Sequence, residues 1–224
     1  NPVAKFLLGL LLIGSIFLGN AAYEAGNLSG ALLGLKGILN REALTIGASF
    51  DLFPLFLGGA VALLLLAGSF RLLKNSLVAI VIVMSLSFVI TALLTHPNII
   101  AVFKGMLSPS FAPDEILTIV GLLGTTVVPY NLFLHAAMVA HSPNLSLNDL
   151  KKDTFVAVGL GGVVSLSIII CAAALEGMEV KNAMDLGKAL SPLYGDWAPM
   201  LLNFGFFAAG LTSALTAPMA AAFV

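Results

Sequence analysis

The chain has 224 residues, of which 59% are hydrophobic and 9% are charged, and its formal net charge at pH 7 is −1. A soluble domain of this size cannot carry so apolar a composition without aggregating, so the composition predicts an integral membrane protein. The near-neutral charge gives no support to nucleic-acid binding, and the single cysteine excludes a disulfide framework or a cysteine-based metal cluster.

Apolar segments recur along the chain, and a helix needs about 20 residues to cross a bilayer. We therefore expect an all-α polytopic membrane protein with one transmembrane domain over residues 1–224 and six transmembrane helices. The expected spans are residues 6–35, 52–70, 77–94, 116–140, 155–175 and 199–224. We expect loops at residues 36–51, 95–114 and 176–197, the last with a short amphipathic helix at residues 182–190. The chain starts at Asn1 and ends in an apolar run at Val224, so we expect it to be part of a longer protein.

The first span carries a polar stripe. Asn20, Tyr23, Glu24 and Asn27 are spaced i, i+3, i+4 and i+7, which places them on one face of a helix. An ionisable group at this depth is costly unless it is paired, neutral or hydrated, and such groups commonly serve ion or proton movement. The stripe therefore predicts an ion or proton pathway. The alternative is a protonated Glu24 that is hydrogen-bonded to Asn20 or to a neighbouring helix.

The fourth span contains residues that interrupt a helix. Gly121 and Gly124 weaken it, Pro129 removes a backbone donor, and Thr126 and Asn131 compete for backbone groups. Lipid cannot satisfy freed carbonyls, so an unwound backbone at this depth must face protein, water or an ion. The pattern predicts a discontinuous helix whose carbonyls coordinate a cation, as in secondary transporters. The alternative is a proline kink that neighbouring helices repair.

The candidate cation ligands are oxygen atoms near this interruption. Unwinding before Pro129 frees the backbone carbonyls of Val127 and Val128, and Thr126 and Asn131 supply the nearest side-chain oxygens. Hard cations such as Mg²⁺ take oxygen ligands and often keep several waters. His135, one turn beyond Asn131, lines an inward path or bonds a neighbouring helix. Further candidates in the sixth span are Thr212, Ser213 and Thr216.

Three stretches carry a family resemblance. Residues 124–135 read G-T-T-V-V-P-Y-N-L-F-L-H and resemble A-T-V-M-P-H-N-L-Y-L-H, the sixth-helix signature of the Nramp divalent metal transporters. Residues 208–217 are similar to that family's eighth-helix A-A-G-Q-S-S-T-I-T-G, and residues 16–33 are similar to its third helix. The resemblance covers the whole chain. It implies helices three to eight of a LeuT-like fold, alternating access, and a divalent metal ion such as Mn²⁺ or Fe²⁺ as substrate, with no permanently bound cofactor.

The sequence departs from the family at its metal site. The D-P-G-N motif of the family's first helix is not in this chain. The metal-binding methionine falls on Val128, and because a thioether favours soft transition metals, its loss predicts weaker discrimination against Ca²⁺ and Mg²⁺ or a hard cation as substrate. At this position the chain is closer to the family's magnesium-transporting branch.

The sequence also departs from the family at positions implied in proton movement. The signature histidine falls on Tyr130, and the first acid of the third-helix pair falls on Ala21, which leaves Glu24. A tyrosine, with a pKa of about 10, cannot exchange protons at neutral pH as a histidine can. These two positions argue against proton coupling. The alternative for Tyr130 is a packed aromatic ring whose hydroxyl caps a carbonyl of the broken helix.

The orientation follows weakly from the positive charges, which are concentrated in short connections on the side of the N-terminal end. We expect that end to be cytoplasmic and the membrane to be a bacterial inner membrane. The positive residues expected on the side of the N-terminal end are Lys5, Arg71, Lys74, Lys151 and Lys152. Those expected on the other side are Lys36, Arg41, Lys104, Lys181 and Lys188.

Two other function classes stay open. One is a transporter for an organic solute or a Na⁺-coupled substrate on the same scaffold, and the other is a structural membrane subunit. We do not expect an enzyme, since the sequence has neither an H-E-x-x-H motif nor a nucleophile elbow.

Overall fold

The computed structural model describes residues 2–40, 45–46, 50–68, 71–109, 112–126, 128–140, 146–175 and 185–223. These residues are almost entirely helical, so the predicted helical class is confirmed. The exception is a short antiparallel pairing of β1 (Thr45–Ile46) with β2 (Phe50–Asp51). Among the described residues, four helical segments are long and apolar enough to cross a membrane. They are Pro2–Leu39, Leu72–Leu94, Leu147–Ala173 and Ser191–Met219.

The longer helices in chain order are α1 (Pro2–Leu39), α2 (Phe53–Ala67), α3 (Arg71–Leu94), α4 (Ile99–Leu107), α5 (Ile116–Thr126), α6 (Pro129–Ala140), α7 (Leu147–Ala173) and α10 (Ala198–Phe223). Short helical turns join them. These are η1 (Pro113–Glu115), α8 (Leu186–Ala189), α9 (Ser191–Tyr194) and η3 (Gly195–Trp197).

Several helices differ in extent from the predicted spans. The second span is a helix of only 15 residues, and the fourth consists of two helices. α7 begins at Leu147 rather than at residue 155, because the hydroxyl of Ser146 accepts a hydrogen bond from the backbone N–H of Asp149 at 3.1 Å. The expected loop at 95–114 contains α4, which Asn98 caps by accepting from the N–H of Ala101 at 3.1 Å. Polar caps thus start helices in stretches that hydropathy alone assigns to loops.

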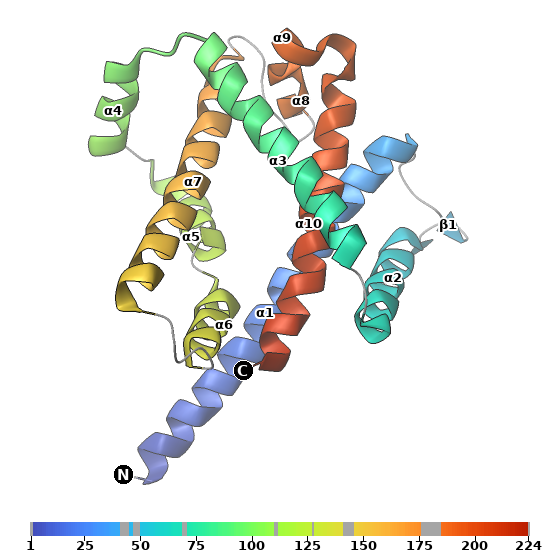
Figure 1. Ribbon diagram of the computed structural model, residues 1–224, viewed down its shortest axis with the longest axis vertical. Helices are drawn as coiled ribbons and strands as arrows, with labels where there is room; N and C mark the ends of the chain where they lie inside the picture. The colour runs from blue at the N-terminus through green and yellow to red at the C-terminus, as the bar shows by residue number, and fades with distance from the viewer. Residues whose placement is uncertain are drawn as a thin grey trace.

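α1 and α10 cross in close contact and run antiparallel, with α3 packed on α10 (Figure 1). Gly210 of α10 lies directly against the backbone of α1 at Asn27 and Ala31, and Gly37 of α1 lies against the side chain of Asn203. A Cβ atom at either glycine would overlap those atoms. Small residues therefore allow the two backbones to approach each other, as is common between helices in membranes.

Two buried clusters form the core. One joins α1, α2, α3 and α10, and the other joins α3, α7, the α8 turn and α10. The second cluster includes Phe88 and Leu202, which are almost fully buried. Beside it the hydroxyls of Tyr194 and Ser87 form a hydrogen bond of 2.7 Å. α3 and α10 belong to both clusters and α1 packs closely on α10, so these three helices form the structural centre.

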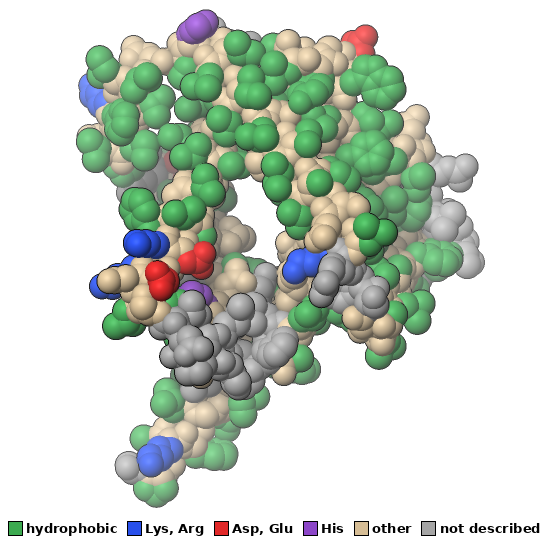
Figure 2. Space-filling view, viewed as in Figure 1, with side chains coloured by type: hydrophobic (Ala, Val, Ile, Leu, Met, Phe, Trp, Pro, Cys, Tyr) green, Lys and Arg blue, Asp and Glu red, His purple; other side chains and the backbone are tan. Residues whose placement is uncertain are grey.

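The α5, α6 and α7 helices lie to one side of this centre (Figure 1). Figure 2 shows an opening through the molecule between this group and α3 with α10. Large apolar side chains of the group are exposed, among them Leu122, Leu132 and Phe155. The interrupted helix therefore borders the opening.

Candidate functional site

The helix of the fourth span is interrupted between Thr126, where α5 ends, and Pro129, where α6 begins. The carbonyl of Val128 accepts a hydrogen bond from the N–H of Asn131 at 3.1 Å and so closes the first turn of α6. Because a carbonyl oxygen has two lone pairs, this bond leaves room for a second partner. Val127, the other carbonyl expected to bind a cation, lies outside the described residues.

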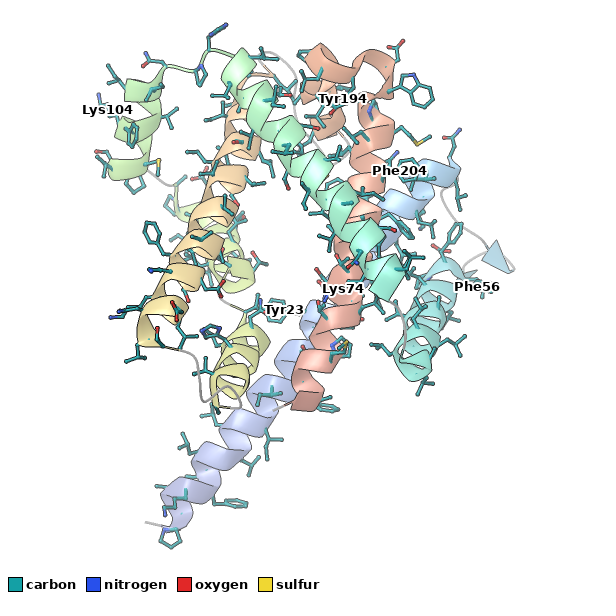
Figure 3. All side chains as sticks on the ribbon, in the orientation of Figure 1. Tyr23, Phe56, Lys74, Lys104, Tyr194 and Phe204 are labelled. Atoms are coloured by element: carbon teal, nitrogen blue, oxygen red, sulfur yellow. The ribbon has the colours of Figure 1, made fainter. Side chains whose placement is uncertain are left out.

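The polar stripe of α1 reaches this interruption. The hydroxyl of Tyr23 donates a hydrogen bond to the carbonyl of Gly124, in the last turn of α5. Figure 3 shows Tyr23 beside the two halves of the interrupted helix, and α6 contacts both α1 and α10. Sequence reasoning placed Tyr23 on the stripe but did not select it as a site residue. Its i+3 spacing from Asn20 was the available signal.

Asn20 joins the stripe to α10. Its Nδ2 donates to the carbonyl of Ala217 at 3.2 Å, and its Oδ1 is buried without a hydrogen-bond partner within the described residues. Ala217 directly precedes Pro218, which lies inside α10 and lacks an N–H. The expected hydrogen bond between Asn20 and Glu24 is therefore absent among the described residues, and Glu24 Oε2 accepts from Asn27 Nδ2 at 3.5 Å instead.

The side chains expected at the interruption differ in their surroundings. The hydroxyl of Thr126 donates to the carbonyl of Leu122 at 2.9 Å, so it bonds its own helix. Asn131 and His135 are exposed on α6. The side chain of Tyr130 lies outside the description, so both of its predicted roles remain predictions.

The candidates on α10 lie along its contact with α1. Thr212, Ser213 and Thr216 are half-buried, between the close approach at Gly210 and the Asn20 bond at Ala217. The hydroxyls of Thr212 and Thr216 donate to carbonyls of α10, at 2.7 Å to Ala208 and 2.9 Å to Thr212. All three flank the stripe, and the hydroxyls of Thr212 and Thr216, like that of Thr126, bond their own helix.

Several oxygen atoms among the described residues of this region could bind a metal ion. They are the carbonyl of Val128, the amide of Asn20, the carboxyl of Glu24 and the hydroxyls along α10. Oxygen donors of this kind suit hard cations. Within the ranges that the structure describes, no group of three or more His, Cys, Asp or Glu side chains could hold a metal ion.

The chain was compared with known proteins. The family model described as Natural resistance-associated macrophage protein-like (Nramp) matches residues 2–224. A protein of Bradyrhizobium diazoefficiens is 29% identical over 236 residues, which cover 98% of this chain and 50% of that protein. A protein of Bacillus subtilis is 27% identical over 207 residues, which cover 86% of this chain and 47% of that protein. A protein of Pectobacterium carotovorum is 26% identical over 208 residues, which cover 89% of this chain and 49% of that protein.

All three relatives are named divalent metal cation transporter MntH. The chain spans half or less of the length of the curated relatives that it matches. The family model nevertheless covers nearly every residue, from the polar stripe of α1 through the interrupted helix to α10. The chain therefore belongs to the Nramp family.

Proposed function

We propose that the protein moves divalent metal cations, Mn²⁺ and Fe²⁺ or Mg²⁺, across a membrane by alternating access at the interruption between α5 and α6. One observation carries the proposal: the interrupted helix faces the polar stripe of α1 through the hydrogen bond between Tyr23 and Gly124. In membrane transporters, unwound backbone at this depth binds coupling ions or substrates. The names of the relatives support a metal ion as the substrate.

The potential metal ligands at the interruption favour a hard cation. Val128 can contribute only its carbonyl oxygen, since its side chain has no donor atom. Thr126 and Asn131 supply the nearest side-chain oxygens, and the sequence between them contains no cysteine or methionine that would select soft metals. We therefore expect Mg²⁺ to be transported beside Mn²⁺.

We also propose that this transport is not coupled to protons. Glu24 is the carboxylic acid of the stripe, and Asn27 bonds its carboxyl. Tyr130 stands where the family signature has a histidine, and a tyrosine does not exchange protons near neutral pH. His135, one turn beyond Asn131 on α6, is the histidine that a recording of internal pH would test.

The architecture that we propose for this function is helices three to eight of a LeuT-like fold. In this arrangement α5 and α6 form one span, and α2, although short, forms another. The relatives are bacterial, which supports a bacterial inner membrane as the location.

Metal uptake by the full-length protein in liposomes tests the proposal, with Mn²⁺ and Mg²⁺ compared side by side and internal pH recorded. We expect both ions to enter while internal pH stays flat. Asn131→Ala removes an oxygen beside the interruption and should slow the uptake of both ions several-fold. Asn75→Ala, at an exposed position on α3, is the matched control and should leave uptake unchanged.

Each contrary result has a specific meaning. Transport of Mn²⁺ with Mg²⁺ excluded would show that the hard-ion preference is wrong. Acidification with uptake would show proton coupling. Absence of metal flux, with an organic solute or Na⁺ moving instead, would refute the cation proposal. Unchanged uptake in Asn131→Ala would mean that the prolines only kink the helix.

A further inference from the structure

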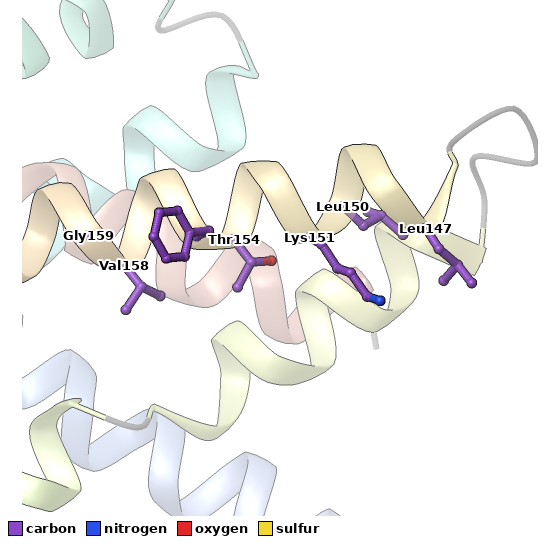
Figure 4. A pocket seen from close by; sticks show the side chains of 7 residues that line it. Leu147, Leu150, Lys151, Thr154, Val158 and Gly159 are labelled. Carbon is purple, nitrogen blue, oxygen red and sulfur yellow. The ribbon is translucent and has the colours of Figure 1, made fainter.

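A groove runs along the first turns of α7. Its volume of about 540 Å³ lies within the range of pockets that hold small ligands, about 300–1,000 Å³. Figure 4 shows its described walls as one stripe of α7 with a single charged side chain, Lys151, near one end. The lining residues are Leu147, Leu150, Lys151, Thr154, Phe155, Val158 and Gly159.

The length of α7 places this groove at a defined depth in a bilayer. The helix has 27 residues, or about 40 Å at 1.5 Å per residue, and the hydrocarbon core is about 30 Å thick. The uncharged part from Phe155 to Ala173 alone is about 28 Å long. Lys151, one turn before Phe155, therefore lies at the level of the lipid headgroups. Val158 and Gly159 lie at the level of the acyl chains.

The groove is positively charged at its headgroup end. Lys151 forms no ion pair with any residue that the structure describes. The nearby acids, Asp149 and Asp153, are each two residues from Lys151, so they project about 160° away around the helix. Asp149 is also engaged at the helix start, where it accepts a hydrogen bond from the hydroxyl of Ser146 at 2.7 Å. Figure 2 shows blue basic and red acidic side chains gathered over the lower part of α7.

We propose that this groove binds an anionic phospholipid. The phosphate pairs with the ammonium group of Lys151, and one acyl chain lies along Phe155 and Val158, whose side chains are 81% and 70% exposed. A lysine at a membrane surface favours an anionic lipid by about fivefold. The neighbouring Lys152 projects about 100° away from Lys151 and does not line the groove.

The test is native mass spectrometry of the full-length protein titrated with dioleoyl phosphatidylglycerol or with dioleoyl phosphatidylcholine. We expect the protein to retain phosphatidylglycerol about fivefold more strongly. Lys151→Gln should remove this preference, Lys151→Arg should keep it, and Lys152→Gln, which makes the same charge change one residue away, should keep it as well. Equal losses in Lys151→Gln and Lys152→Gln, or no preference in the unaltered protein, would overturn the proposal.

A second pair of variants tests the apolar end. Val158→Phe fills the groove and should reduce the number of bound lipids. Val156→Phe, on the opposite side of α7 at a position that is 55% exposed, should not. A photoreactive benzoyl-phenylalanine in place of Phe155 identifies the occupant. A phospholipid adduct supports the proposal, whereas a cross-link to another part of the protein or to a second copy refutes it. Neither readout depends on metal transport.

Discussion

The crossing of α1 with α10 and the group formed by α5, α6 and the first half of α7 are both apolar in sequence but packed in opposite ways. At the crossing, Ala208 and Ala214 are fully buried, and glycines let the backbones touch. In the α5–α7 group, Leu122 and Val158 are 63% and 70% exposed. Composition therefore says little about which helices pack, and a glycine alone says little more, since a Cβ at Gly121 or Gly159 would meet no atom within 4 Å whereas one at Gly210 would overlap α1.

Because they pack differently, the two regions have different roles at the site. The crossing holds the polar stripe of α1 at a fixed level against α10, through Gly210 and the Asn20 bond to Ala217. The interrupted helix meets the same stripe through the Tyr23 hydroxyl, and none of the described side chains of α5 and α6 is buried. Regions with few buried contacts open locally at low cost, so motion is expected in α5 and α6 rather than in α1 and α10.

The largest predicted effect is at the crossing. Gly210→Ala places a Cβ on the backbone of α1 at Asn27 and Ala31, which must then move away. Such overpacking costs about 1–3 kcal/mol, so we expect a clear loss in the midpoint of thermal unfolding measured in detergent.

Gly121→Ala is the matched control for that substitution. A Cβ at Gly121 meets no atom within 4 Å, so the same change should leave the protein unharmed or stabilise α5 by up to about 1 kcal/mol. Equal destabilisation by the two variants would show that the crossing is not specially close-packed.

The second-largest predicted effect comes from the same substitution, tyrosine to phenylalanine, made once in each region. Tyr23→Phe removes the bond to the Gly124 carbonyl, and Tyr194→Phe removes the bond to Ser87. Ser87 donates its own proton to the carbonyl of Val83 at 2.7 Å, so the Tyr194 hydroxyl is the donor to Ser87. Each deletion should cost about 1 kcal/mol of stability.

The two variants should differ in metal uptake. On the proposed function, only Tyr23→Phe slows uptake, by several-fold, because only Tyr23 contacts the interrupted helix. The check is liposome uptake beside the unfolding midpoint for both variants. If Tyr194→Phe slows uptake as much as Tyr23→Phe does, the division between the two regions is wrong.

Much of this arrangement could be predicted from local sequence patterns. Gly124 and Pro129 indicated the interruption, and the i, i+3, i+4, i+7 spacing put Asn20 and Glu24 on one face. The bond of Tyr23 to Gly124 could not be predicted, since it joins residues 101 positions apart and depends on how α1 and α5 pack. The same holds for the Asn20 bond to α10, because a stripe shows which residues share a face but not which helix they meet.

The smallest predicted effect is at the edge of the crossing, where α1 meets the connection to α2. The ammonium group of Lys36 lies 2.6 Å from Asp51 Oδ2 and 5.9 Å from the centre of the Phe53 ring. Both charged side chains are partly exposed, at 29% and 26%, so the pair is expected to contribute at most about 1 kcal/mol.

Salt dependence distinguishes this pair from packing. Lys36→Gln should lower the unfolding midpoint slightly at 0.15 M salt and less at 1 M, where the Debye length falls from about 8 Å to about 3 Å. Lys104→Gln, at an exposed lysine of α4 with no ion pair among the described residues, should have no effect at either concentration. A loss in Lys36→Gln that is unchanged by salt would mean that the lysine stem and its contact with Phe53, rather than the charge pair, stabilise the connection.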